Sequence, residues 1–229
     1  MLHNKMTTEQ ILEEIRKDSF LLLSKSLSFY NVFSRNRNNM AQTFNYTSSR
    51  NNIYQVIYLR RDYGIVFYVV TKIPTDYGNK WVLVLLDCKQ SKLEGIKIIN
   101  PHVIDRIQER WQIDSDVNII SQMIMELNNA PTFFLNENKE LMPRHDVFVP
   151  HQKYGIVAHI GTGLIFGEFF TCGTNLEKTI IAEEIKTYLP THMLNKRQRE
   201  IESILSEEKQ VRKQMENIFN LWKYKSNTI

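Results

Sequence analysis

The feature that most restricts the fold is a series of strand-like segments separated by short turns in the first half of the chain. The segments are Tyr54–Arg60, Gly64–Lys72, Lys80–Cys88 and Gly95–Ile99. Strands joined by such short connections pair antiparallel, because a parallel pair needs a crossover of about a dozen residues or more. The pattern therefore predicts a hairpin of Tyr54–Arg60 and Gly64–Lys72 within a mostly antiparallel sheet.

Further strands and helices are predicted around this series. The later strand candidates are Thr132–Leu135, Asp146–His151, Gly155–Ile160 and Leu164–Cys172. Thr7 and Gln10 form a capping-box pattern, and apolar residues then recur at helical spacing to about Ser26. Asn100 and Pro101 suit the cap and first position of another helix, and a third is expected over residues 116–128. These elements predict an α+β fold with a mostly antiparallel sheet flanked by helices.

The C-terminal segment has a different pattern. Seven of the nine a and d positions of a heptad frame are apolar, and Arg197 and Glu208 interrupt it. The apolar residues are Leu194, Ile201, Ile204, Val211, Met215, Ile218 and Trp222. This spacing predicts a long amphipathic helix that either packs back on the domain or forms a homodimer through residues 194–222. We therefore expect one α+β domain over residues 1–190 and a long helix over 191–229.

Composition and cysteine usage indicate a soluble, cytoplasmic protein. Of the 229 residues, 42% are hydrophobic and 24% charged, which is typical of a folded globular chain. Cys88 and Cys172 lie in strand-like segments and provide no disulfide framework. The polar N-terminus lacks the layout of a signal peptide, and no apolar run is long enough to cross a bilayer, so we expect no membrane partner.

Basic residues gather in one acid-free segment. Between Ser19 and Arg61 there is no acidic residue, while six residues are lysine or arginine. Its polar stretch over residues 31–52 has no period and predicts a long basic loop. Five residues of this loop are candidate nucleic-acid contacts: Arg35, Arg37, Phe44, Tyr46 and Arg50. Arginine neutralises phosphate and aromatic rings stack on unpaired bases, so the loop suits single-stranded RNA. Two alternatives are a surface covered by a partner or inhibitor protein, and a loop whose aromatics anchor it to the core.

The helix expected from residue 101 carries a candidate catalytic row. At 100° per residue, His102, Arg106, Glu109 and Arg110 share one face, and apolar residues fill the opposite face. A neutral His102 imidazole could act as general base for a ribose 2′-hydroxyl. Arg106 and Arg110 could hold phosphate oxygens, with Glu109 orienting an arginine or sharing the proton transfer. The alternative is a solvated helix face with weak surface ion pairs.

A second group of polar residues lies on the later strands. It comprises Arg144, His145, Asp146, His151 and His159. The spacing matches no zinc motif, so we expect no metal and no cofactor. Strand alternation places His159 on the less apolar face of its strand. We interpret His159 as a second acid/base residue for the His102 row, and the alternative is an ordinary polar strand position.

Residues 99–176 resemble a known arrangement. An H-x-x-x-R-x-x-E-R helix (His102, Arg106, Glu109, Arg110) is followed by a second helix and by strands that end in Phe169-Phe170-Thr171. This order is similar to that of the RelE/ParE-like toxins and related metal-independent nucleases. The resemblance implies two helices across a curved antiparallel sheet, and RNA cleavage through a 2′,3′-cyclic phosphate. It covers about a third of the chain; the long preceding segment and the C-terminal helix depart from the family pattern.

Two functional hypotheses result from the sequence, together with a structural one. The first is a nucleic-acid-directed protein acting as a metal-independent endoribonuclease of toxin type. The alternative is a non-enzymatic nucleic-acid- or protein-binding module of phage or mobile-element origin. The third hypothesis is a homo-oligomeric structural protein assembled through the C-terminal helix.

Overall fold

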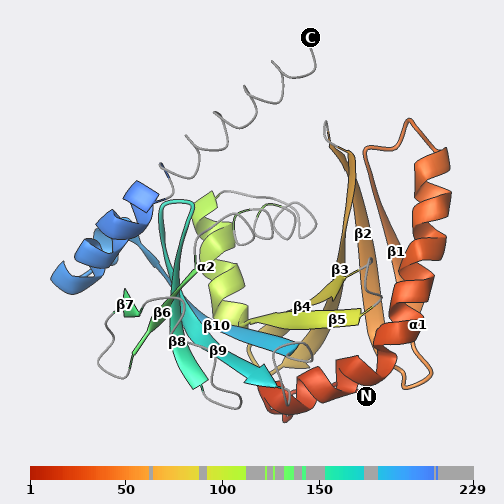
Figure 1. The fold of residues 1–229 in the computed structure, drawn as a ribbon, viewed down its shortest axis with the longest axis horizontal. Helices are drawn as coiled ribbons and strands as arrows, with labels where there is room; N and C mark the ends of the chain where they lie inside the picture. The colour runs from red at the N-terminus through yellow and green to blue at the C-terminus, as the bar shows by residue number, and fades with distance from the viewer. Residues whose placement is uncertain are drawn as a thin grey trace, which may run out of the picture. The chain divides into compact units, whose positions relative to one another are not determined.

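The computed structural model of the chain is shown in Figure 1. The residues it describes are 1–61, 64–87, 92–111, 122, 126, 132–136, 141–142, 153–172, 180–208 and 210. They include ten strands that form one sheet in the order β1-β2-β3-β4-β5-β10-β9-β8-β6-β7. The predicted α+β class with a mostly antiparallel sheet is therefore confirmed.

The chain divides into two compact units. Unit 1 comprises Met1–Asp105, Phe148–Lys153 and Glu168–Lys186, and unit 2 comprises Arg106–Val147, Tyr154–Gly167 and Thr187–Ile229. The expectation of a single domain up to residue 190 stays a prediction. Each unit has its own cluster of buried apolar side chains and is described separately below.

Helix α1, Thr8–Arg35, begins as the sequence predicts but ends later. The Thr7 hydroxyl accepts from the backbone N–H of Gln10, and the Gln10 side chain accepts from the backbone N–H of Thr7. This capping box satisfies donors that the first helical turn leaves free. The helix continues past Ser26 because the ring of Phe33 is fully buried in the core of unit 1.

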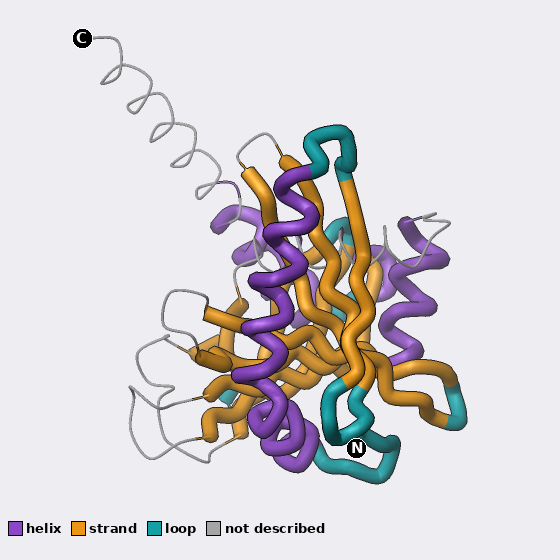
Figure 2. Tube along the Cα trace, turned by 90° about the vertical axis from the view of Figure 1, so that its right-hand side faces the viewer, coloured by secondary structure: helices purple, strands orange, loops and turns teal. Residues whose placement is uncertain are grey.

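The first five strands belong to unit 1. Their bounds are β1 Ala41–Thr47, β2 Ile53–Arg61, β3 Gly64–Thr75, β4 Gly78–Asp87 and β5 Lys92–Ile99. Each pairs antiparallel with the next, which confirms the predicted hairpin of β2 and β3. Figure 2 shows α1 lying along one face of these strands, where its apolar residues meet theirs.

The predicted basic loop over residues 31–52 is wrong in its secondary structure. Its first part is the last turn of α1, and residues 41–47 form strand β1. Side chains of β1 alternate between exposed and half-buried, with Thr43, Asn45 and Thr47 exposed and Phe44 and Tyr46 toward the core. Pairing with β2 satisfies the backbone, and this long-range interaction makes a strand from a segment with weak local preference.

The remaining strands include two that the sequence did not predict, β7 and β10. Their bounds are β6 Thr132–Leu135, β7 Leu141–Met142, β8 Lys153–Ile160, β9 Gly163–Cys172 and β10 Ile180–Pro190. Strand β10 pairs parallel with β5, from Ile181 opposite Gly95 to Ile185 opposite Ile99. The predicted strand at Asp146–His151 and most of the helix predicted over 116–128 lie outside the described residues, although Gln122 and Glu126 are helical.

Residues 196–208 form a helix in unit 2, after a single 3₁₀ turn at Thr191–Met193. Leu194, Ile201 and Leu205 are buried there with Val157 and Leu164. The described part of the C-terminal segment thus packs back on its own unit, one of the two predicted arrangements. Residues 211–229 lie outside the description, so the full length of the helix stays a prediction. No helix among the described residues is both long and apolar enough to cross a membrane.

Candidate functional site

Helix α2, Pro101–Trp111, carries the predicted catalytic row. Its start is defined by the carbonyl of Asn100, which accepts from the N–H of Val103 at 3.0 Å. The N–H of Asn100 in turn donates to the carbonyl of Ile185 in β10. Pro101 occupies the first helical position, where its missing N–H costs nothing. The sheet therefore sets the position of the first turn, and with it the position of His102.

The two faces of α2 separate as the periodicity predicts. Val103, Ile104 and Ile107 are buried, with exposed fractions of 7% or less. The side chains on the opposite face are exposed: His102, Asp105, Arg106, Glu109 and Arg110. The predicted row therefore faces solvent along a single continuous helix.

Among the described residues, Arg106 is the one member of the row whose side chain has hydrogen-bond partners. Its Nη1 donates to the carbonyl of Tyr188 at 3.1 Å and to Oγ1 of Thr187 at 3.3 Å. Both partners lie in β10 and in the same unit as Arg106. Because a guanidinium has five N–H donors, the remaining ones stay available for a phosphate group. Among the described residues, neither His102 nor Arg110 has a hydrogen-bond or ion-pair partner.

The charge of the exposed α2 face is balanced. Arg106 and Arg110 supply two positive charges, and Asp105 and Glu109 supply two negative charges. Asp105 was not part of the predicted row, although it lies on the same face. The two carboxylates repel a phosphate group and so oppose the attraction of the two arginines. The face therefore offers local phosphate contacts but no net attraction for a polyanion.

His159, the predicted second acid/base residue, is buried in β8 of unit 2. Its Nε2 lies 3.3 Å from Oε1 of Glu202, which belongs to the helix over 196–208. The two side chains are 11% and 21% exposed. This contact joins the helix to the sheet of its own unit. The rest of the predicted polar group, Arg144, His145, Asp146 and His151, lies outside the described residues.

Three of the five predicted RNA contacts take part in internal packing. Arg50 binds Glu14 in a bidentate ion pair, with Nε and Nη2 at 2.9 and 2.7 Å from the carboxylate oxygens. The ring of Phe44 stacks on Phe29 with centroids 4.7 Å apart, and Tyr46 stacks on Tyr54. These contacts support the alternative in which the aromatics anchor the segment to the core.

The other two predicted contacts, Arg35 and Arg37, are exposed at the end of α1. Arg60, from β2, reaches the same turn, where its Nη2 and Nε lie 3.4 Å from the carbonyls of Asn36 and Asn39. Its guanidinium also lies 5.3 Å from the ring centroid of Phe33. We call Arg35, Arg37 and Arg60 the arginine cluster. Only the fold brings Arg60 to the other two residues.

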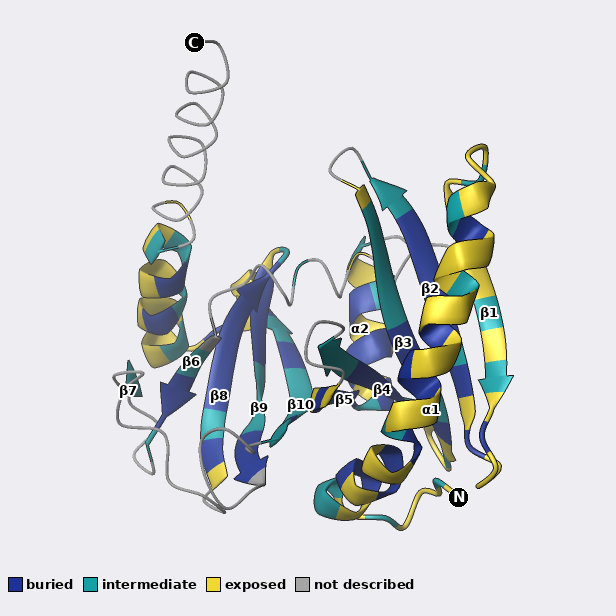
Figure 3. Cartoon of the chain, turned by 45° about the vertical axis from the view of Figure 1, so that its right-hand side comes forward, coloured by how far each residue is buried: buried dark blue, intermediate teal, exposed yellow. Residues whose placement is uncertain are grey.

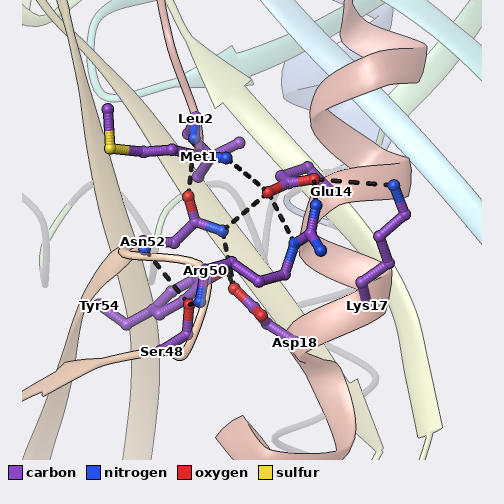
Figure 4. A network of polar contacts seen from close by, with 9 residues as sticks. All are labelled: Met1, Leu2, Glu14, Lys17, Asp18, Ser48, Arg50, Asn52 and Tyr54. Carbon is purple, nitrogen blue, oxygen red and sulfur yellow. Dashed lines mark hydrogen bonds and ion pairs between the residues drawn. The ribbon is translucent and has the colours of Figure 1, made fainter.

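The most strongly perturbed ionisable groups belong to a buried polar network in unit 1 (Figure 4). Glu14 and Asp18 are 5% and 2% exposed, one turn apart on α1. Hydrogen bonds from Arg50 hold the pKa of Glu14 at about 2. Asp18 accepts from Asn52 Nδ2 at 2.8 Å and from the Tyr54 hydroxyl at 2.9 Å. Burial and the adjacent Asp18 raise the pKa of Tyr54.

This network ties three segments of unit 1 together. The α-amino group of Met1 lies 2.8 Å from Glu14, and the backbone N–H of Leu2 donates to Asn52. Ser48 accepts from the backbone N–H of Asn52, which closes the turn between β1 and β2. We did not predict these contacts. The available signal was two carboxylates at i and i+4 on the otherwise apolar face of α1, where a buried acid needs a partner.

Comparisons with known proteins give no relative on which to base a function. No family model matches the chain, and neither a curated protein nor a solved structure matches it. Any functional conclusion must therefore be drawn from the residues themselves.

Proposed function

We propose that this protein binds single-stranded nucleic acid, RNA in particular, through the arginine cluster at the end of α1. The observation that carries the proposal is the exposure of Arg35 and Arg37 beside Arg60, in a segment with no acidic residue from Ser19 to Arg61. A cluster of positive charges of this kind attracts a polyanion, and guanidinium groups suit phosphate geometry.

Each arginine has a distinct part in this proposal. Arg60 is oriented by the Asn36 and Asn39 carbonyls, so little side-chain entropy is lost when a phosphate binds its free N–H groups. Arg35 and Arg37 are exposed and can follow the backbone of a flexible strand. Tyr30, 41% exposed on the same half of α1, offers a ring on which an unpaired base could stack.

The test is fluorescence anisotropy with a labelled single-stranded RNA, measured over a range of salt concentrations. Three phosphate contacts on a single strand predict that log affinity falls against log salt with a slope of about −2. Arg35→Ala/Arg37→Ala should weaken binding and make the slope shallower. Lys5→Ala/Arg16→Ala removes the same charge from exposed positions at the other end of unit 1 and serves as control. Equal losses in both double variants would contradict a localised site.

A second candidate function is metal-independent RNA cleavage by the exposed row of α2. The observation that favours it is a solvent-facing His102 one turn from an Arg106 that β10 holds in place. In this reaction His102 accepts the proton of a 2′-hydroxyl while that oxygen attacks the adjacent phosphorus. The P–O5′ bond breaks, the 5′-oxygen takes up a proton, and a 2′,3′-cyclic phosphate remains. The resemblance to RelE/ParE-like toxins supports the same reaction.

Cleavage is tested by incubating RNA with the purified protein in EDTA and identifying the 3′ ends of the fragments. The expected product carries a 2′,3′-cyclic phosphate, and an all-deoxy strand of the same sequence stays intact. His102→Ala should abolish the fragments, whereas Asp105→Ala, on the same face, should retain them or increase their rate by removing a repulsive charge. Fragments that persist with His102→Ala would exclude this row as the catalytic site.

A further inference from the structure

Strand β1 has one long edge without a partner among the described residues. It is the first strand in the sheet order and pairs only with β2 (Figure 3). Natural edge strands are usually protected by charged residues, proline, bulges or a very short length. The seven residues of β1, Ala-Gln-Thr-Phe-Asn-Tyr-Thr, include no charge and no proline, and their register with β2 is unbroken. Such an edge can accept another strand.

The hydrogen bonds to β2 show which backbone groups face this edge. The carbonyl of Met40 accepts from Arg60 N–H at 2.8 Å, and the N–H of Ser48 donates to the Asn52 carbonyl at 2.9 Å. In an antiparallel pair, the residues whose N–H and C=O groups bond to the partner strand recur at every second position. Met40 and Ser48 are both such residues, so the even-numbered residues of β1 bond to β2. The N–H and C=O groups of the odd-numbered residues point away from β2: Ala41, Thr43, Asn45 and Thr47.

We propose that two copies of this protein pair antiparallel through β1, with the twofold axis at Phe44. Thr43 of one copy then faces Asn45 of the other, and Ala41 faces Thr47. This register places each outward-facing residue of one strand opposite an outward-facing residue of the other. It therefore uses all of the free backbone groups and forms roughly eight hydrogen bonds. A register shifted by one residue would place an odd-numbered residue of one strand opposite an even-numbered residue of the other. The backbone groups of the even-numbered residues are already bonded to β2.

The side chains of β1 suit a second copy. On the face toward α1, each Phe44 is half-buried and stacked on Phe29, and at the axis the two Phe44 rings would meet. On the other face, Thr43 and Asn45 are exposed, small and uncharged, so no like charges oppose one another. The strand is thus complementary to itself, which a cyclic twofold interface requires.

Helix α1 has an exposed apolar residue on the side where a second copy would lie. Phe33 stacks on Tyr58 in β2, and Phe29 stacks on Phe44 in β1. Continuing in the same direction around the helix, at 100° per residue, the next apolar side chain is Val32, which is 55% exposed. An axis normal to the sheet keeps both α1 helices on one face. In each copy α1 packs over β1 and β2, the two strands nearest the axis. The two α1 helices would then lie about 10 Å apart, a distance at which helices pack against each other.

The proposed register is tested by charge substitutions at the two exposed positions. Thr43→Lys/Asn45→Lys places lysine opposite lysine twice across the axis and should raise the dimer dissociation constant by at least about tenfold. Thr43→Lys/Asn45→Glu places lysine opposite glutamate twice and should leave the dimer intact. The readout is solution mass by sedimentation equilibrium, with circular dichroism to establish that each variant is folded.

Three results would overturn the proposal. The parent protein could be a monomer at every accessible concentration. The dimer could persist unchanged in the lysine pair, which would place the interface elsewhere. The lysine–glutamate variant could dissociate as readily as the lysine pair, which would exclude this register. As an independent check, Asn45→Pro removes one outward-facing donor while sparing the bonds to β2, and it should also give a folded monomer.

Discussion

Two groups of arginines from the same acid-free segment have opposite roles in the structure. Arg50 turns inward and forms a bidentate ion pair with Glu14, a carboxylate that α1 buries. Arg35 and Arg37, in the same segment, lie exposed beside Arg60. Basic residues that lie close together in the sequence therefore do not define one surface. Whether an arginine is free for a ligand depends on whether the fold brings an acid to it.

The largest effect is expected from removing a buried acceptor of the network. Asp18→Ala leaves the buried Tyr54 hydroxyl without its acceptor and leaves the Asn52 amide only its longer contact with Glu14. We expect a loss of about 3 kcal/mol in the free energy of unfolding. Urea denaturation measures it. Tyr54→Phe, which removes one donor and keeps the carboxylate hydrogen-bonded to Asn52, should cost only about 1 kcal/mol. Equal losses would mean that the hydroxyl alone explains the effect.

Arg50→Ala should have the next largest effect on stability. The change leaves Glu14 buried, although Met1, Lys17 and Asn52 still contact it. The guanidinium is partly exposed to solvent, so we expect a loss of unfolding free energy that is smaller than that of Asp18→Ala. Arg35→Ala, in the same assay, should change stability by less than about 0.5 kcal/mol. A similar loss of stability in both variants would contradict a structural role that is specific to Arg50.

The ion pair also predicts a dependence of stability on pH. The pKa of Glu14 is lowered from 4.5 to about 2 in the folded protein. A carboxylate with a lowered folded-state pKa contributes stability above its unfolded-state pKa and loses that contribution as the pH falls. The urea midpoint should therefore decrease between about pH 4.5 and 2. The decrease attributable to this carboxylate should be smaller in Arg50→Ala. An identical profile for the two proteins would exclude Glu14 as the titrating group.

The outward arginines should affect binding and leave stability unchanged. Arg35→Ala/Arg37→Ala removes two proposed phosphate contacts and should raise the dissociation constant for single-stranded RNA about tenfold at low salt. Arg50→Ala, if the folded fraction is accounted for, should have little effect on the same constant. Anisotropy titrations of the three proteins give the comparison. Weaker binding in Arg50→Ala than in the double variant would place the RNA site near Arg50 and exclude the arginine cluster.

The smallest effect on stability is expected at His102. The side chain is exposed on α2 and has no hydrogen-bond or ion-pair partner among the described residues, so His102→Ala should change the unfolding free energy by less than about 0.5 kcal/mol. Thermal melting measures this. Loss of RNA cleavage without loss of stability would separate chemistry from folding at this position. A marked drop in melting temperature would instead assign His102 a structural role.

Much of the fold could be predicted because its signals are local. The capping box at Thr7, the turns between β2, β3 and β4, and Pro101 at the start of α2 each depend on residues a few positions apart. The separation of α2 into a buried and an exposed face also follows from helical period alone. The same reasoning failed for β1, because its identity as a strand depends on pairing with β2.

Strand β10 shows the same limit. Its buried residues recur at every third position over much of its length, and a strand with one covered face would alternate in twos. Parallel pairing with β5, more than eighty residues away, supplies its backbone partners. In the candidate site, the anchoring of Arg106 depends on this strand, so it could not be predicted from the helix that carries the arginine.

The sequence by itself determined the class of fold, the hairpin of β2 and β3, the starts of α1 and α2 and the exposed row of α2. These features follow from hydrogen bonding and burial within a few residues of one another. The tertiary structure alone decided that Arg50 pairs with the buried carboxylate of Glu14, that Arg60 joins Arg35 and Arg37, and that β1 ends the sheet. Charges and strand edges acquire their roles from neighbours that are distant along the chain, because electrostatic attraction and backbone pairing act through space.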